Sequence, residues 1–320
     1  MTKTKEKKIT MIDFEELYGT LGKELSGNQK RLSIESVLGV YYGMSKDGFF
    51  RISFMSSRKA PNIESTRLLR ITQGSESEGV YWTCFDLLQH DAQKVFFTFC
   101  ESLIEAIEGI SEEKKALDVL KTRYITWKAL FKRECSNRLT REELQGLFGE
   151  LYFLNKYMIP KYGTNEAIRS WSGPDAKSKD YSIKTDWYEI KTIGANSVTV
   201  KISSLSQLTS EHEGHLAVIR VEAMSEQYDN EDASIGAVFT SILSKICDES
   251  IEAIFLSKLG AYGFDISDES FMSKYEVKSM NLYMVNEEFP RLTEANINKP
   301  EVCDVEYSLI VNSLLPYMED

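Results

Sequence analysis

The stretch that decides the fold reads Asp180-Tyr-Ser-Ile-Lys-Thr-Asp-Trp-Tyr-Glu-Ile-Lys191. Its two alternating runs, 181–184 and 187–193, flank a turn-like tripeptide, which predicts a β-hairpin. Residues two apart in a strand face the same side, so Glu189 and Lys191 project together, with Asp180 near the strand end beside Glu189. Two carboxylates and an ammonium on one surface can hold a hard divalent cation and orient a water molecule. The stretch therefore indicates metal-dependent hydrolysis of a phosphodiester.

Upstream of this hairpin, the segment 141–158 has the pattern of an amphipathic helix that a capping box of Thr140 and Glu143 opens. Its apolar stripe comprises Leu144, Leu147, Phe148, Leu151 and Leu154. Glu150 falls within that stripe, and burial of an unpartnered carboxylate costs several kcal/mol or more. We expect Glu150 to be paired with a basic residue, bound to a metal or protonated.

The order and spacing of several short motifs resemble the PD-(D/E)XK nuclease superfamily, and within it the proteins encoded near bacterial restriction and defence genes. The motifs are Gly149-Glu-Leu-Tyr-Phe-Leu154, Trp171-Ser-Gly-Pro174, Lys179-Asp-Tyr181, Tyr188-Glu-Ile-Lys-Thr192, and Val200-Lys-Ile-Ser-Ser204 with Gln207-Leu208. The resemblance runs from about Gly146 to Leu208. A lone E-x-K has little meaning, because it also describes one face of any amphipathic strand, and Glu276-Val-Lys278 repeats it in this chain.

The resemblance implies roles for the residues that match its pattern. Asp180 and Glu189 would bind the metal, with the backbone carbonyl of Ile190 as an extra ligand. Lys191 would position the attacking water or stabilise charge that develops on the phosphate. The implied cofactor is Mg²⁺, for which Mn²⁺ would substitute.

Two further residues receive roles from the same resemblance. Glu150 would tune the site or bind a second metal, and Gln207 would be a polar residue beside the site. The literal Pro-Asp of the family pattern is Pro174-Asp175, yet Asp180 fits better because it directly starts the apolar strand. Lys201 is either a phosphate contact or an ordinary solvated lysine.

The implied fold class is α/β, with a restriction-endonuclease-like core of a helix, a three-stranded meander, a helix and a strand. The core elements are expected at 141–158, 180–184, 187–193, 197–202, 204–209 and 215–222. This core would occupy 136–224, between a β-rich N-terminal domain (1–135) closed by helices and a C-terminal α+β extension (225–320) packed on the core.

The flanking regions carry their own patterns. We expect strands within 33–56, 66–72 and 79–84, then helices at 91–109 and 112–133. Beyond the core we expect a helix at 235–247, a strand pair at 276–287 and a strand at 303–310.

Charge and composition limit the classes of function without choosing one. The net charge of −11 opposes DNA binding, although 121–141 holds seven basic residues and one acid. That stretch also suits a solvated helix face. The five cysteines form no C-x-x-C pair, and no signal peptide or membrane-spanning run is visible, so a cytoplasmic protein is expected.

Other chemistries have weak support. The motif His212-Glu-Gly-His215 has poor spacing for a helical metal site, and Gly214 weakens a helix there. The chain has no G-x-x-x-x-G-K-[ST] phosphate loop and no G-x-S-x-G nucleophile elbow.

The sequence therefore predicts a divalent-metal-dependent endonuclease that cleaves double-stranded DNA to 5′-phosphate products in restriction or phage defence. Cleavage of both strands usually needs two active sites, so a homodimer or a partner is expected. Family context implies a helicase-like ATPase and a methyltransferase as companions. The alternative is a catalytically silent binding or scaffold subunit of a defence complex that keeps the fold.

Overall fold

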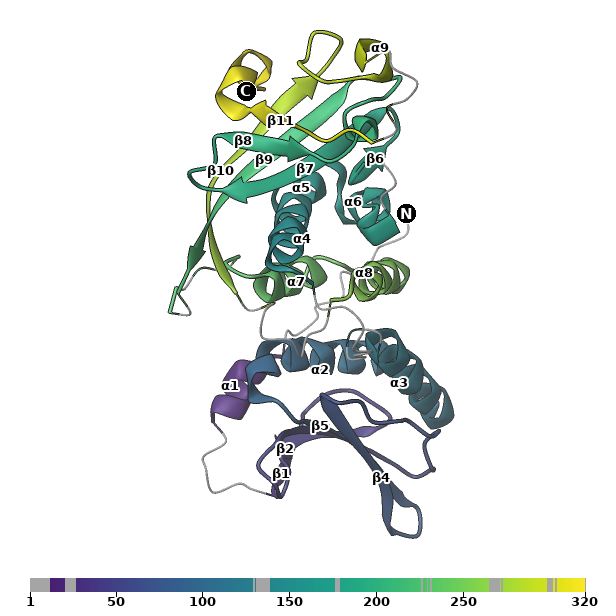
Figure 1. Ribbon diagram of the computed structural model, residues 1–320. Coiled ribbons are helices and arrows are strands. Elements are labelled where there is room, and N and C mark those ends of the chain that lie inside the picture. Colours follow the sequence, from purple (N-terminus) through teal and green to yellow (C-terminus); the bar gives the residue numbers. More distant parts are fainter. Residues whose placement is uncertain are drawn as a thin grey trace, which may run out of the picture. The chain divides into compact units, whose positions relative to one another are not determined.

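The computed structural model describes residues 12–20, 27–128, 130, 139–175, 179–225, 227–228, 230, 232–264, 271, 273–297, 302 and 304–319 (Figure 1). The chain divides into two compact units, Met1–Arg133 and Glu134–Asp320. In the described part of the chain, no helix is long and apolar enough to cross a membrane.

The first unit is an antiparallel sheet with helices on one face (Figure 1). Its strand order is β1-β2-β3-β5-β4. The strands are β1 (Gln29–Arg31), β2 (Gly39–Met44), β3 (Phe50–Ser56), β4 (Leu69–Ser77) and β5 (Val80–Leu87), and the helices are α1 (Phe14–Gly19), α2 (Gln93–Ile107) and α3 (Glu113–Lys128). Ring contacts from Phe54 to Phe85 and from Phe85 to Phe99 join the sheet to α2 and lie in the core of this unit.

Most elements expected in the first unit are present, with shifted ends. Strand structure in the 33–56 region starts only at β2, and the short strand β1 before it was not expected. Helix α3 ends at Lys128, and residues 131–133 of the expected helix lie outside the described residues.

The second unit is built on a mixed sheet with the strand order β10-β9-β7-β6. Its strands are β6 (Tyr181–Ile183), β7 (Asp186–Gly194), β9 (Gly214–Met224) and β10 (Lys274–Val285). Strands β7 and β9 are parallel, while β6 with β7 and β9 with β10 are antiparallel. Because β10 pairs with β9, the expected core 136–224 and its extension 225–320 share one sheet.

Helix α4 (Arg141–Phe153) packs on one face of this sheet. Its N-terminus has the expected capping box, with the Thr140 side chain bonded to the Glu143 N–H and the Glu143 side chain bonded to the Thr140 N–H. The helical path extends past the expected end at 158 through a π-helical segment, Leu154–Met158, into α5 (Ile159–Tyr162). Pro160 has no N–H to donate, which interrupts regular helical bonding at this point.

Close packing of α4 on β7 depends on a glycine. A Cβ on Gly149 would lie 1.7 Å from Oγ1 of Thr192, so only glycine lets the helix approach the strand this closely. The Gln145 side chain adds a hydrogen bond of 3.1 Å to the Thr192 carbonyl. The helix residue next to Gly149 is Glu150, which is thereby held near β7.

The expected three-stranded meander is wrong in its third strand. Strand β8 (Thr199–Ile202) does not pair with β7 but with β11 (Tyr307–Ile310) in a separate two-stranded sheet. The edge of β7 that β8 would need is already occupied, because β9 pairs with β7 in parallel from Tyr188 to Gly194. Strand β6 pairs with β7, and its residue Tyr181 also forms an isolated antiparallel bridge with Trp171 upstream.

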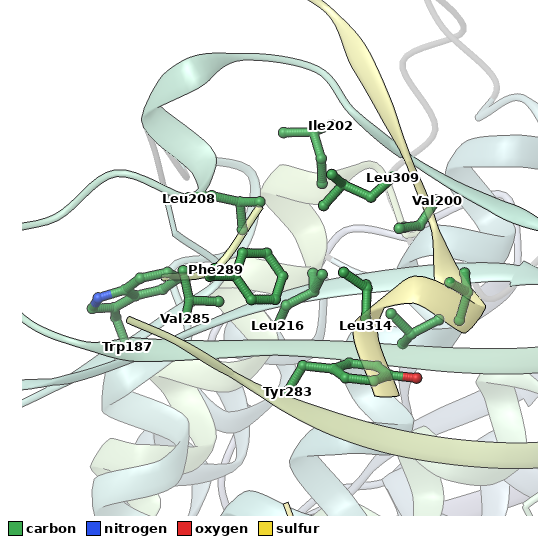
Figure 2. Packing of buried hydrophobic residues seen from close by; sticks show 12 residues of the cluster. Trp187, Val200, Ile202, Leu208, Leu216, Tyr283, Val285, Phe289, Leu309 and Leu314 are labelled. Atoms are coloured by element: carbon green, nitrogen blue, oxygen red, sulfur yellow. The ribbon is translucent and has the colours of Figure 1, made fainter. Parts of the chain in front are cut away.

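Strands β8 and β11 cover the sheet face opposite α4. Their side chains Val200, Ile202 and Leu309 join Leu216 and Tyr283 of the large sheet in one buried cluster (Figure 2). Burial of this apolar surface is what stabilises the cover, since the two strands share no ladder with the sheet. Val198, directly before β8, is exposed.

The remaining corrections concern the region after β8. The short helix expected at 204–209 is a 3-10 turn, Leu205–Gln207, and the strand pair expected at 276–287 is the single strand β10. Strand β10 is a single strand because β9 pairs with it along its length, from Lys274 to Val285. The chain also forms helices α6 (Thr164–Ser170), α7 (Ile235–Leu243), α8 (Glu249–Tyr262) and α9 (Glu294–Ile297), and a closing 3-10 helix, Val311–Tyr317.

Of these helices, only α7 was expected, at 235–247. Helix α8 escaped prediction although Asp248 caps its start and Gly263 ends it in the left-handed conformation. Strand β11 is shorter than the expected 303–310, and Cys303 lies outside the described residues.

Candidate active site

Asp180 and Glu189 face each other across the β6–β7 hairpin. Tyr181 pairs with Tyr188, so the next pair along the register is Asp180 with Glu189. The Ile190 N–H donates to Oδ2 of Asp180 over an N···O distance of 2.7 Å. Side chains of a cross-strand pair lie on the same face of a sheet, so the hairpin brings both carboxylates to one place.

The alternative acid of the family pattern lies elsewhere. Pro174-Asp175 is part of a 3-10 turn, Gly173–Asp175, outside the strands of the sheet. Ile190 contacts the site through its N–H. Its carbonyl as a metal ligand stays a prediction.

Lys191 lies beside Glu189 as the two-residue spacing requires. Its Nζ is 2.7 Å from Oε1 of Glu189. The Glu189 side chain is 2% exposed and that of Lys191 is 17% exposed. The ion pair is therefore largely removed from water, where its electrostatic interactions are screened less than at a surface.

Burial raises the pKa of both carboxylic acids. Burial, and next the charge of Asp180, raise the pKa of Glu189 to about 8, although Lys191 and Lys179 oppose the shift. Burial also raises the pKa of Asp180, against the Ile190 N–H and the same two lysines. A cation bound between these groups would relieve the repulsion and favour their ionised forms.

Glu150 approaches the carboxylate pair from α4. Its Oε2 accepts a hydrogen bond of 2.8 Å from the Trp171 indole, and its Oε1 accepts one of 2.9 Å from the Tyr262 hydroxyl. Burial, followed by the charge of Asp180, raises the pKa of Glu150 well above its usual value. Among the described residues, no Lys or Arg forms an ion pair with Glu150. Of the three expected states of Glu150, pairing with a basic residue is therefore not found there.

Gln207 was predicted as a site residue, but its side chain does not reach the carboxylates. Its Oε1 accepts a hydrogen bond of 2.8 Å from the Ser203 N–H, within its own turn. Its backbone carbonyl instead accepts a hydrogen bond of 2.6 Å from Nζ of Lys179. Gln207 therefore reaches the site only through this lysine.

Lys179, for which no role was expected, interacts electrostatically with both Glu189 and Asp180. Burial lowers the pKa of its ammonium to about 8, against the charges of Glu189 and Asp180. The only sequence signal is its place directly before Asp180. Trp171 was part of a motif without a role, and Tyr262 carries no signal at all, because 112 residues separate it from Glu150.

A hard divalent cation fits these donors. Among the described residues, no group of three or more His, Cys, Asp or Glu side chains is arranged to hold a metal ion. Mg²⁺ commonly takes one or two protein carboxylates and completes its shell with water and phosphate oxygens, so Asp180 and Glu189 are sufficient. The absence of thiolate and imidazole from this pair favours Mg²⁺ or Mn²⁺ over zinc.

Other polar groups singled out from the sequence have structural partners. Nδ1 of His215 lies 2.5 Å from Oε1 of Glu319, and the His215 ring stacks on Tyr188. Lys201 is exposed and pairs with Glu306. In the basic stretch 121–141, residues 131–138 lie outside the described residues.

Comparison with protein families gives one match, over residues 14–312, to a family described as "Putative PD-(D/E)XK family member" (DUF4420). Comparisons with curated proteins and with solved structures find no match. The family match spans nearly the whole chain and contains every candidate site residue. This chain belongs to that PD-(D/E)XK family.

Proposed function

We propose that this protein is a divalent-metal-dependent endonuclease that hydrolyses phosphodiester bonds of double-stranded DNA. The observation that carries the proposal is the bond from the Ile190 N–H to Asp180, which brings Asp180 beside Glu189, together with the Lys191 ammonium 2.7 Å from Glu189. Family membership supports the same chemistry, because the family is described by the PD-(D/E)XK pattern and its match includes the segment that carries Asp180, Glu189 and Lys191.

In the proposed reaction, Asp180, Glu189 and the Ile190 carbonyl hold Mg²⁺, which supplies Lewis acidity and an activated water when bound. The Ile190 N–H fixes Asp180 at one oxygen and leaves the other to a ligand. Lys191, two residues along the same strand face, places a positive charge beside the attacked phosphate. Departure of the 3′-oxygen leaves a 5′-phosphate.

In this proposal Glu150 acts on the metal-binding pair, Asp180 and Glu189, and is not one of their partners in holding the first metal. Trp171 and Tyr262 hold both of its oxygens, and its carboxylate interacts electrostatically with Asp180 and Glu189. It therefore tunes the charge of the metal-binding pair, and a rearrangement of the Tyr262 hydroxyl would free one oxygen for a second metal.

The biological setting follows from the family resemblance. We propose a role in restriction or phage defence, with a homodimer or a partner completing double-strand cleavage. A helicase-like ATPase and a methyltransferase from the same locus are the proposed companions.

A silent scaffold subunit is the second candidate. One observation favours it: the chain itself satisfies Glu189 through Lys191 and Asp180 through the Ile190 N–H. Against it, no arginine in the described residues neutralises the pair, and the charge of Asp180 still raises the pKa of Glu189.

Titration calorimetry with Mn²⁺ tests the proposal directly. The wild type should bind one or two ions, and Asp180→Ala and Glu189→Ala should both lose binding at this site. Cleavage of plasmid DNA in Mg²⁺ or Mn²⁺, with candidate partners added, follows. Binding that survives in both variants would place the ion elsewhere, and intact DNA under every condition would favour the scaffold.

A further inference from the structure

The hydrogen-bond partners of the Lys179 ammonium are unusual for a buried lysine. The residue is 9% exposed, and lysines this buried normally pair with a carboxylate. Its Nζ instead donates to the carbonyls of Ser206 and Gln207, at 2.7 and 2.6 Å. The ammonium also lies 3.9 Å from the centroid of the Trp187 ring, a cation–π contact.

A second cation holds the same turn. Nη1 of Arg291 donates to the Leu208 carbonyl at 2.5 Å, so three successive carbonyls, at 206, 207 and 208, accept hydrogen bonds from two cations. The Leu208 side chain is buried in the cluster that also contains Trp187 (Figure 2). The turn is therefore fixed on its inner side by two positive charges and an apolar anchor.

Trp187 provides a rigid base for Lys179. Its Nε1 donates to the His212 carbonyl at 2.9 Å. A Cβ on Gly214 would lie 1.9 Å from the indole, so only glycine admits the ring in this place. Trp187 and Glu189 face the same side of β7, two residues apart, which is about 6.5 Å along a strand. Lys179 directly precedes Asp180 in the chain. Its ammonium contacts Trp187, on the strand of Glu189, and bonds to the turn, so it connects Asp180, this strand and the turn.

The outer side of the turn carries hydroxyl groups. Ser203, Ser206 and Thr209 are exposed, and Ser204 and Ser210 are half-buried. Phosphate and sugar oxygens of DNA are commonly contacted by such hydroxyls and by backbone N–H groups. Within the described residues, neither Lys179 nor Arg291 forms an ion pair with a carboxylate, so their charges make the potential over the turn favourable to phosphate.

We propose that the segment 203–210 contacts the DNA sugar–phosphate backbone beside Asp180 and Glu189, and that Lys179 is the positioning residue that holds the segment there. The inference rests on the proposed nuclease function and names the surface that engages its substrate. Lys179 acts through the turn and does not touch the phosphate.

Two sets of variants of the full chain test the inference. The first set removes exposed hydroxyls, as the combined substitution Ser203→Ala, Ser206→Ala and Thr209→Ala, with Thr72→Ala and Ser75→Ala on β4 as the matched control. The second is Lys179→Met, which keeps the length of the side chain and removes its charge. The measurements are DNA affinity by fluorescence anisotropy of a labelled duplex, Mn²⁺ binding by calorimetry, and amide hydrogen exchange over 203–210.

We expect the hydroxyl variant to bind the duplex about tenfold more weakly than the wild type, with Mn²⁺ binding unchanged. The control variant should match the wild type in both measurements. Lys179→Met should lose DNA affinity by a similar factor and show faster exchange in 203–210, a combination that general loss of stability would not confine to one segment. If Lys179→Met fails to fold, the hydroxyl variant still decides.

The outcomes separate this inference from the proposed function. Unchanged duplex affinity in the hydroxyl variant, or an equal loss in the control, overturns the inference even if Asp180→Ala and Glu189→Ala abolish Mn²⁺ binding. Failure of the wild type to bind Mn²⁺ through those carboxylates contradicts the proposed function, whatever the turn variants show. A wild type without affinity for the duplex overturns the inference.

Discussion

Two of the E-x-K tripeptides in this chain lie on strands, one on β7 and one on β10, and their comparison shows what makes a site. Glu189 and Lys191 form an ion pair of 2.7 Å, and so do Glu276 and Lys278. The side chains of the first pair are 2% and 17% exposed, whereas those of the second are 34% and 38% exposed. Identical local spacing therefore produces a buried pair in the middle of a sheet and a solvated pair on its edge strand.

The neighbours of the two pairs also differ. Glu189 has a second acid, Asp180, opposite it in the hairpin, and burial with that charge raises its pKa to about 8. Lys278 contacts both Glu276 and Glu222, and these hydrogen bonds raise the pKa of its ammonium. The β10 pair is an ordinary surface network, while the β7 pair has an excess of buried negative charge that a cation can compensate.

The largest expected difference between the pairs is in metal binding. Glu189→Ala should reduce DNA cleavage by on the order of 10³-fold or more and abolish Mn²⁺ binding, because it removes a proposed metal ligand. Glu276→Ala should leave both unchanged, as measured by calorimetry and plasmid nicking. Equal effects of the two substitutions would show that burial beside Asp180 does not distinguish the β7 pair from the β10 pair.

A smaller effect is expected from the lysines. Lys191→Met should lower kcat by about 10²- to 10³-fold while Mn²⁺ still binds, because the proposed role of the ammonium is to stabilise charge on the phosphate and not to bind the metal. Lys278→Met should have the activity of the wild type. Loss of Mn²⁺ binding in Lys191→Met would instead mean that the lysine only maintains the geometry of Glu189.

The pH dependence of stability should also separate the pairs. Glu189 has a pKa of about 8 in the folded protein, so the folded state holds a proton that the unfolded chain releases near pH 4.5. The unfolding free energy therefore falls, by a few kcal/mol, as pH rises between these values, and levels off above about 8. In metal-free buffer, Glu189→Gln should make this decline in urea unfolding smaller, with the rest due to the raised pKa values of Asp180 and Glu150, while Glu276→Gln should leave the decline unchanged. A wild-type profile that is flat from pH 5 to 8 would contradict the raised pKa.

The smallest effect concerns the packing of helix α4 on β7. Gly149→Ala should destabilise the protein by about 1–3 kcal/mol, since its Cβ would lie 1.7 Å from Oγ1 of Thr192. Gly146→Ala in the same helix meets no atom within 4 Å and should stabilise it by about 0.5–1 kcal/mol. Urea unfolding measures both. A neutral Gly149→Ala would show that α4 can move away from β7 without loss.

Local patterns in the sequence determined the elements around the site. The capping box at Thr140 and Glu143, the alternating strands and the turn at 184–186 all depend on residues close in the chain, and each is present. The hairpin also determined that Asp180 would lie beside Glu189, since register follows from the short turn. Glu150 was recognised as anomalous because it interrupts an apolar stripe.

Only the tertiary structure decided how distant segments combine. The pairing of β8 with β11, the partners Trp171 and Tyr262 of Glu150, and the attachment of Lys179 to the turn join residues 21 to 112 positions apart. Periodicity shows which face of a strand is apolar, but it does not show which edge will be free, because edges are assigned by competition among all strands for pairing and burial. For the same reason the sequence alone did not distinguish Glu189-Ile-Lys191 from Glu276-Val-Lys278 by burial.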